Sequence, residues 1–139
     1  MIAFRSFVTT LCTALILVAV VSCASVDGRL GGSWRLASWT VSSLDPGVFQ
    51  ITAHFDDGTI SGSTGVNTYS GLYKLGPDNS FAVDDISSTE MAGSEPAMRA
   101  EAAYTKLLGQ ARSYNHIDGA LILYDQNGNE SLRFEAMGK

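Results

Sequence analysis

Cysteine is scarce in this chain, and its two copies, Cys12 and Cys23, both lie near the N-terminus. The rest of the chain therefore cannot contain a disulfide, a cysteine metal site or a cysteine nucleophile. Basic residues are also few: nine Lys and Arg stand against fourteen Asp and Glu, for a net charge of −5. Nucleic-acid binding needs clustered Lys and Arg, so we expect no such partner. The 139 residues suffice for one domain and are too few for two full ones.

Charge is nearly absent from residues 1–22, in which Arg5 is the one charged residue. A positive charge, an apolar run and small residues at its end are typical of a secretion signal. The run is short for a membrane-spanning helix, which needs about 20 residues. Its end, Val20-Val21-Ser22-Cys23, is similar to the bacterial lipobox, in which the cysteine is diacylated and becomes the first residue. We expect residues 1–22 to be removed and Cys23 to carry lipid.

Lipid on Cys23 would hold the protein at a membrane, because each buried lipid methylene contributes about 0.8 kcal/mol. The next residue is Ala24 rather than Asp, which in Gram-negative lipoproteins of this type favours the outer membrane, with the domain facing the periplasm. Residues 23–32 are then a lipidated cysteine and short tether, followed by the domain, residues 33–137. Ordinary cleavage after Ala24 or Ser25 is the alternative, and it would give a secreted or periplasmic soluble protein.

Short alternating segments in the body of the chain predict β-strands. These are Ser33–Val41, Val48–Phe55, Thr59–Ser61, Leu72–Leu75, Phe81–Ile86, Tyr114–Ile117, Ala120–Tyr124 and Ser131–Met137. Simple alternation places Trp34 and Leu36 on one face of the first strand and Trp39 on the other, so we expect that strand to be covered on both sides.

One helix is predicted, with Ser94 as its N-cap and an end at Leu108 before Gly109. Two stripes of residues fall at helical spacing. They are Met98, Ala102, Thr105 and Leu108, and next to them Ala97, Ala100, Tyr104 and Leu107. The predicted fold is mainly β, of the α+β class: a curled antiparallel sheet or partial barrel of seven or eight short strands, with the helix packed against it.

Glycine and small polar residues dominate Gly62–Gly71, which predicts a poor strand and no helix. In one interpretation, the glycines open a binding surface ringed by Asn67, Tyr69 and Tyr73. In the other, Asn67 holds the loop through its amide while both tyrosines fill the core. The candidate residues of this stretch are Gly62, Gly65, Asn67, Tyr69, Gly71 and Tyr73.

The order of these segments resembles the META domain, also called the HslJ-like family. The residues that carry the resemblance are Phe55–Gly62, Gly65–Tyr73, Thr89–Ala92 and Leu121–Phe134. META domains occur in bacterial envelope lipoproteins and in heat-inducible proteins linked to antibiotic tolerance, so the resemblance implies a role in envelope stress. Many members have cysteine where this chain has Val66 and Gly93. If those cysteines pair in relatives, this chain lacks both halves of the bridge.

No residue of the chain is assigned a catalytic role. His54 and His116 have no acid paired with them in the sequence, as a nucleophile's base would need. Asp125–Glu130 is faintly like a calcium loop, but it lacks the glycine that such a loop has at its sixth position and the distal Glu. A hairpin turn at Asn127-Gly128 explains the segment without an ion. We expect no enzymatic activity, no cofactor, no metal ion and a monomeric protein.

The expected function is a non-enzymatic binding or interaction module on an envelope lipoprotein, whose partner is another envelope protein or a wall component. One alternative is an inhibitor of a hydrolase such as a lysozyme or protease, with a protruding Gly62–Tyr73 or Ser42–Gly47 loop. Another is a carrier of small hydrophobic ligands, with a cavity instead of a filled core. Its predicted lining is Phe49, Phe55, Tyr73 and Phe81.

Overall fold

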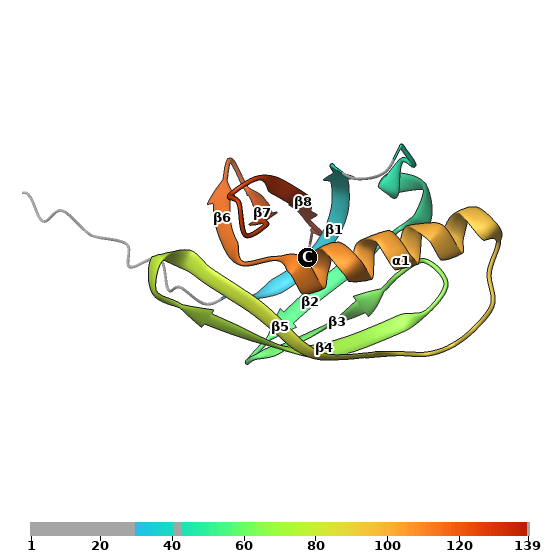
Figure 1. The fold of residues 1–139 in the computed structure, drawn as a ribbon, viewed down its shortest axis with the longest axis horizontal. Helices are drawn as coiled ribbons and strands as arrows, with labels where there is room; N and C mark the ends of the chain where they lie inside the picture. Colours follow the sequence, from blue (N-terminus) through green and yellow to red (C-terminus); the bar gives the residue numbers. More distant parts are fainter. Residues whose placement is uncertain (1–29, 41–42, 139) are drawn as a thin grey trace, which may run out of the picture.

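Eight antiparallel strands form a closed barrel, in which each strand pairs with its sequence neighbours and β1 pairs with β8 (Figure 1). The computed structural model describes residues 30–40 and 43–138. The strands are β1 Gly32–Trp39, β2 Thr52–Asp56, β3 Thr59–Ser63, β4 Thr68–Gly76, β5 Ser80–Ser88, β6 Ser113–Ile117, β7 Ala120–Tyr124 and β8 Glu130–Ala136. The prediction of a mainly β fold with seven or eight strands and one helix is confirmed.

Helix α1, Glu95–Gln110, connects β5 to β6 and packs against the barrel (Figure 1). Ser94 caps it, since the Ser94 Oγ accepts a hydrogen bond from the Ala97 N–H at 3.4 Å. The buried helix residues are Ala100, Tyr104, Leu107 and Leu108. Of the two predicted stripes, the one through Tyr104 therefore faces the barrel, whereas the first three residues of the other are exposed. The helix continues through Gly109, so its predicted end is two residues short.

The ring is closed between β5 and β6 by a single paired position, Ser80 with Ser113. Next to it, the Phe81 N–H donates to the Arg112 carbonyl oxygen at 2.9 Å. Figure 1 shows β6 turning away from β5 beyond this point, with α1 alongside. Because α1 contacts both β5 and β8, it covers the side of the barrel where strand pairing is sparse.

A β-bulge in β1 corrects the predicted orientation of Trp39. The pairing of β1 with β8 shifts by one residue between Leu36 and Ser38. An extra residue in a strand returns the next side chain to the same face. Trp34, Leu36 and Trp39 are consequently all buried in one core, and the prediction of a strand covered on both sides is wrong.

Two predicted boundaries also change. Val48–Ile51 precede β2 instead of belonging to it, because Pro46–Phe49 form the 3-10 turn η1 and Gln50 has a φ of 52°. Leu30–Gly32, expected in the tether, belong to the folded domain: Leu30 is buried, and its carbonyl accepts a hydrogen bond from Tyr73 Oη at 2.9 Å. The expected signal, Cys23, and the tether up to residue 29 lie outside the described residues, as does Ser42.

Aromatic rings fill the barrel near Leu30. The ring centroids of Phe55 and Tyr73 are 5.2 Å apart, and those of Tyr73 and Phe81 are 6.4 Å apart. We call Phe55, Tyr73 and Phe81 the aromatic cluster. Three of the four side chains expected to line a ligand cavity thus pack on one another, and the fourth, Phe49, is partly buried against the same hydrophobic core.

Candidate functional site

The glycine-rich stretch Gly62–Gly71 forms the end of β3, a turn and the start of β4. Gly62 pairs with Tyr69, and Ser63 pairs with Thr68. The prediction of poor strand structure holds for the four turn residues 64–67 and is wrong on both sides of them. The strands form because a two-strand ladder satisfies the backbone of small residues that have little intrinsic preference for a strand.

Two glycines let the backbone of this stretch approach its neighbours. A Cβ on Gly62 would lie 2.1 Å from the Thr52 carbonyl oxygen, and a Cβ on Gly65 would lie 2.4 Å from that of Phe49. Gly65 also has a φ of +93°, which side chains with a Cβ rarely adopt. The turn is therefore packed directly against β2 and η1 and does not protrude as a loop.

Asn67 ties the turn to the segment before α1. Its side chain is buried, and its Oδ1 accepts hydrogen bonds from the Met91 N–H at 2.7 Å and from Thr89 Oγ1 at 2.9 Å. Its Nδ2 donates to the Met91 carbonyl oxygen at 3.2 Å. One amide thus connects the turn to residues 89–91, which lie 22 to 24 residues farther along the sequence.

Glu101 brings α1 into the same network. Its carboxylate accepts hydrogen bonds from Asn67 Nδ2, at 2.9 and 3.1 Å, and from Thr64 Oγ1 at 2.5 Å. Sequence reasoning missed this residue. The signal that could have indicated it is its position in the sequence: an acid beside the buried stripe of the helix, three residues before Tyr104. We call Thr64, Asn67, Thr89, Met91 and Glu101 the Asn67 cluster.

The two candidate tyrosines both face the core. Tyr69 Oη donates to the Thr52 carbonyl oxygen at 3.0 Å and lies 2.6 Å from Tyr104 Oη. Burial raises the pKa of Tyr69 and of Tyr104 well above the usual value for a phenol. Tyr73 is buried in the aromatic cluster. Neither ring surrounds an open surface.

The six candidate residues thus separate into two groups. Gly62, Gly65, Asn67 and Tyr69 meet at the turn, whereas Gly71 and Tyr73 lie farther along β4. Gly71 lies opposite a bulge in β5, where the register shifts and Asp85 has a φ of 54°. The proposed lipidation residue, Cys23, is outside the described residues.

The Asn67 cluster connects elements instead of presenting free groups. Among the described residues, no buried side-chain nitrogen or oxygen lacks a hydrogen-bond partner. Because its donors and acceptors are paired with one another, the cluster fixes the turn, the segment before α1 and the helix relative to each other. Val66 of the turn packs against Gly93, and a Cβ on Gly93 would lie 3.4 Å from the Val66 Cβ.

The two histidines occupy different environments. His54 Nδ1 lies 3.0 Å from Ser33 Oγ on the exposed face of the sheet. The ring of His116 lies 5.6 Å from that of Trp34, and partial burial lowers the pKa of His116. Within residues 30–40 and 43–138, no three His, Cys, Asp or Glu side chains gather as metal ligands would. In the same residues, no helix has the length and apolarity of a membrane span.

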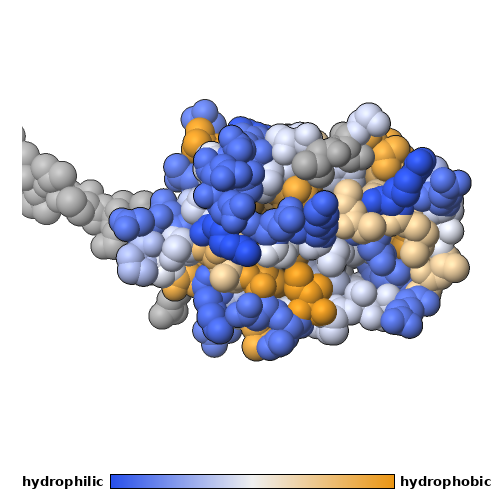
Figure 2. All heavy atoms as spheres, in the orientation of Figure 1, coloured by the Kyte–Doolittle hydropathy of each residue, from blue (hydrophilic) through white to orange (hydrophobic). Residues whose placement is uncertain are grey.

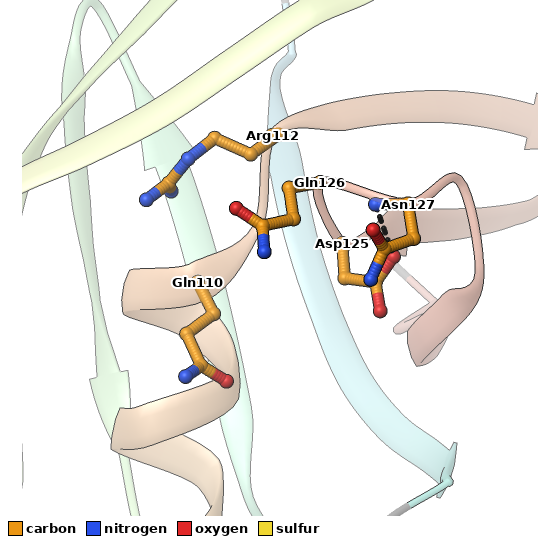
Figure 3. Close-up of a pocket in the computed structure, with 5 residues that line it drawn as sticks. All are labelled: Gln110, Arg112, Asp125, Gln126 and Asn127. Atoms are coloured by element: carbon orange, nitrogen blue, oxygen red, sulfur yellow. Dashed lines mark hydrogen bonds between the residues drawn. The ribbon is translucent and has the colours of Figure 1, made fainter.

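A polar hollow lies between the end of α1 and the β7–β8 turn (Figure 3). Its lining residues are Gln110, Arg112, Asp125, Gln126 and Asn127. The Asp125 carboxylate accepts hydrogen bonds from the backbone of Asn129 and Asn127, which lower the pKa of Asp125. Arg112 Nη1 donates to the Gly109 and Ala111 carbonyl oxygens. These two charged groups thus stabilise the turn and the helix end.

Comparisons with known proteins agree with this architecture. The family described as META domain matches residues 27–138. The solved structure of a protein from Burkholderia xenovorans is 26% identical, with a TM-score of 0.62, over 78% of this chain and 83% of that one. A DUF4847 family protein from Bacteroides vulgatus has the same fold at 14% identity and a TM-score of 0.59, over 78% and 94% of the two chains. No curated protein matches the chain.

Proposed function

The chain belongs to the META domain family, and on that premise we propose that it is a lipid-anchored protein of the bacterial outer membrane that faces the periplasm. Its domain acts as a non-enzymatic interaction module that supports the envelope under stress or antibiotic challenge. The observation that carries the proposal is the lipobox-like Val20–Cys23, which comes only seven residues before the buried Leu30.

The short connection sets where the domain can act. Seven residue steps span at most about 25 Å, even when fully extended. The buried Leu30 is hydrogen-bonded to Tyr73 of β4. Tyr73 lies five residues from Thr68, the first residue of β4 after the β3–β4 turn, which corresponds to about 17 Å along the strand. A partner would therefore be met within a few tens of ångströms of the membrane surface.

The Asn67 cluster supports the binding part of the proposal. It fixes the backbone of Met91, whose side chain is 57% exposed, and the turn that carries Val66. On the face shown in Figure 2, hydrophilic residues dominate and hydrophobic residues reach the surface in separate areas. A fixed backbone reduces the entropy lost when a partner binds, which favours an interaction role.

The first experiment measures the intact mass of the protein from the membrane fraction. We expect a mature mass that starts at Cys23 and includes acyl chains, and we expect Cys23→Ala to lose it. Cys12→Ala is the matched control, because Cys12 leaves with the signal and its loss should not change the mature mass. A soluble, unacylated product that starts near Ser25 would overturn the anchored protein in favour of a secreted one.

The second experiment tests the role of the anchored protein. A strain without the gene should be more sensitive to detergent and to wall-active antibiotics, and wild type should restore growth where Cys23→Ala does not. Equal growth of all strains under these stresses would contradict the proposed role. Crosslinking in place would then identify what the anchored domain contacts. The hydrolase-inhibitor alternative predicts a protruding Gly62–Tyr73 or Ser42–Gly47 loop. In the first of these, Thr64 and Asn67 of the β3–β4 turn are buried, which favours the interaction module.

A further inference from the structure

Small polar side chains, four serines and one histidine, lie in register across one side of the barrel. Directly paired positions run from Ser33 in β1 through His54, Ser61 and Ser70 to Ser87 in β5. All five side chains are exposed or half-buried. Neighbouring strands are about 4.8 Å apart, so the row offers a hydrogen-bonding group at each such step across the sheet.

A second row lies next to the first. Ser63 of β3 pairs with Thr68 of β4, and the Thr68 N–H donates to Thr89 Oγ1 at 3.2 Å. On the other side, Thr52 Oγ1 accepts a hydrogen bond from the Ser63 N–H at 3.0 Å. The second row is therefore Thr52, Ser63, Thr68 and Thr89. We call the two rows together the hydroxyl face.

A hollow lies where the rows cross β4 and β5. Every residue that lines it has a hydroxyl group: Thr68, Tyr69, Ser70, Ser87, Ser88 and Thr89. The Tyr69 hydroxyl points to the core, and that of Thr89 donates to Asn67 Oδ1. Ser70 and Ser87 are exposed and their oxygens are 3.5 Å apart, at the limit for a hydrogen bond. The Ser70 and Ser87 hydroxyls can therefore donate hydrogen bonds to a ligand and accept them from it.

Charge distinguishes the hydroxyl face from the neighbouring outer surface. Neither row contains Lys, Arg, Asp or Glu, and His54 is the one titratable side chain in the two rows. Ion pairs begin at its borders, with Arg35–Glu135 at 3.6 Å on one side and Lys74–Asp84 at 3.1 Å on the other. An anionic or cationic polymer therefore finds no opposite charge within the two rows.

We propose that the hydroxyl face binds an uncharged glycan chain of the cell wall, laid across β2–β5. Such a chain presents hydroxyl and amide groups along its length, and Ser and Thr hydroxyls can pair with either. Each contact exchanges water for sugar and contributes little alone, so affinity comes from many contacts in series. The choice of a wall glycan as occupant rests on the proposed function, whereas binding to the face is testable without the anchor.

The test uses the full-length protein in detergent, labelled with ¹⁵N, and titrates it with a tetramer of N-acetylglucosamine. We expect a Kd of about 1 mM and amide shifts that centre on Ser61, Ser70, Ser87 and Ser88. The single sugar should bind at least about tenfold more weakly because it spans fewer positions. The absence of shifts, or shifts centred on α1, would overturn the proposal.

Paired variants assign the effect to the face. Ser70→Ala with Ser87→Ala removes two exposed hydroxyls, and Ser70→Glu with Ser87→Glu adds charge at the same positions; each should weaken tetramer binding about tenfold. Thr105→Glu on the exposed side of α1 is the control and should bind as wild type does. Unchanged binding by both double variants, or equally tight binding of an anionic oligosaccharide of the same length, would contradict the assignment. Because the intact-mass experiment reports only on the anchor, the two proposals fail independently.

Discussion

The two ends of the barrel are stabilised in different ways. At one end, the Asn67 cluster connects the β3–β4 turn, residues 89–91 and α1 by hydrogen bonds of 2.5–3.2 Å. At the other end, the rings of Phe55, Tyr73 and Phe81 pack without such bonds between them. Hydrogen bonds depend on which atom stands at each position, whereas ring packing depends mainly on volume. The ends should therefore respond differently to the same kind of change.

The largest effect is expected at the aromatic cluster. Phe55→Ala removes a ring that is 1% exposed and touches both Tyr73 and Phe81. We expect the free energy of unfolding to fall by about 4 kcal/mol, measured by chemical denaturation. Phe55→Leu, which keeps most of the volume, should cost less than about 1.5 kcal/mol. Equal losses for both variants would show that this end depends on the ring itself, not on volume.

A smaller loss is expected at Gly62, where an added methyl group meets backbone. Gly62→Ala should lower stability by about 3 kcal/mol, because the Thr52 carbonyl oxygen at 2.1 Å cannot move without breaking strand contacts. Gly109→Ala is the matched control: nothing lies within 4 Å of its added Cβ, and alanine favours the helix by about 1 kcal/mol. Opposite signs for the two alanines are the expected result, and a neutral Gly62→Ala would contradict the close approach.

A disulfide should strengthen the turn end by a similar amount. The Val66 Cβ and a Cβ on Gly93 would be 3.4 Å apart, close to the 3.5–4.5 Å seen in disulfides. Val66→Cys with Gly93→Cys should form the bond and raise stability by about 3 kcal/mol, and a reductant should remove the gain. Peptide mass mapping detects the link. Failure of the pair to oxidise would show that the turn lies farther from the residue 93 segment.

A change of one atom type should break the Asn67 cluster. Asn67→Asp replaces an amide donor with a carboxylate next to that of Glu101, and we expect a loss of about 2 kcal/mol at pH 7. Repulsion between the two neighbouring carboxylates should raise the pKa of one of them in this variant. As the pH falls, that carboxylate takes up a proton and part of the stability should return. Adding Glu101→Gln restores a donor–acceptor pair and should recover most of the loss at pH 7. Purely additive losses in the double variant would exclude direct coupling.

The smallest effect concerns His116, beside Trp34. Partial burial lowers the pKa of this imidazole, so its NMR titration midpoint should lie below the usual 6.5. A depressed pKa means that the neutral form is favoured in the folded state. Its contribution is therefore present above pH 6.5 and lost as the pH falls through the folded-state pKa. His116→Gln should make stability slightly less dependent on pH in that range, measured by urea unfolding.

The strands and helix start that sequence patterns predicted well have strong local signals. Ala120–Tyr124 follows a two-residue turn, and Ser94 precedes an acid and a proline, so local chemistry determines both. Val48–Ile51 alternates like a strand but follows Pro46, whose turn continues into η1. The turn that begins at Pro46 therefore continues through Gln50, and the alternating pattern of residues 48–51 did not reveal this.

The Asn67 cluster was only half predictable. The unusual backbone of Gly65 and the polar role of Asn67 are local features that sequence patterns indicate. Glu101 is 34 residues away from Asn67, and only the packing of α1 against the barrel brings the two together. The hydroxyl face could not be predicted either, because it depends on the register between neighbouring strands, which the sequence of a single strand does not show.

The single Ser80–Ser113 pair between β5 and β6 has a consequence for local unfolding. The other seven of the eight strand pairs form longer ladders. Separating β5 from β6 should therefore need less free energy than separating any other pair. Opening this junction exposes few backbone groups to water and leaves the hairpin of β6 and β7 intact. The amide proton of Phe81, which donates across this junction to the Arg112 carbonyl oxygen, should therefore exchange with solvent sooner than amide protons inside the β3–β4 ladder. The barrel would behave as a curled sheet whose edges can part while most of its core remains folded.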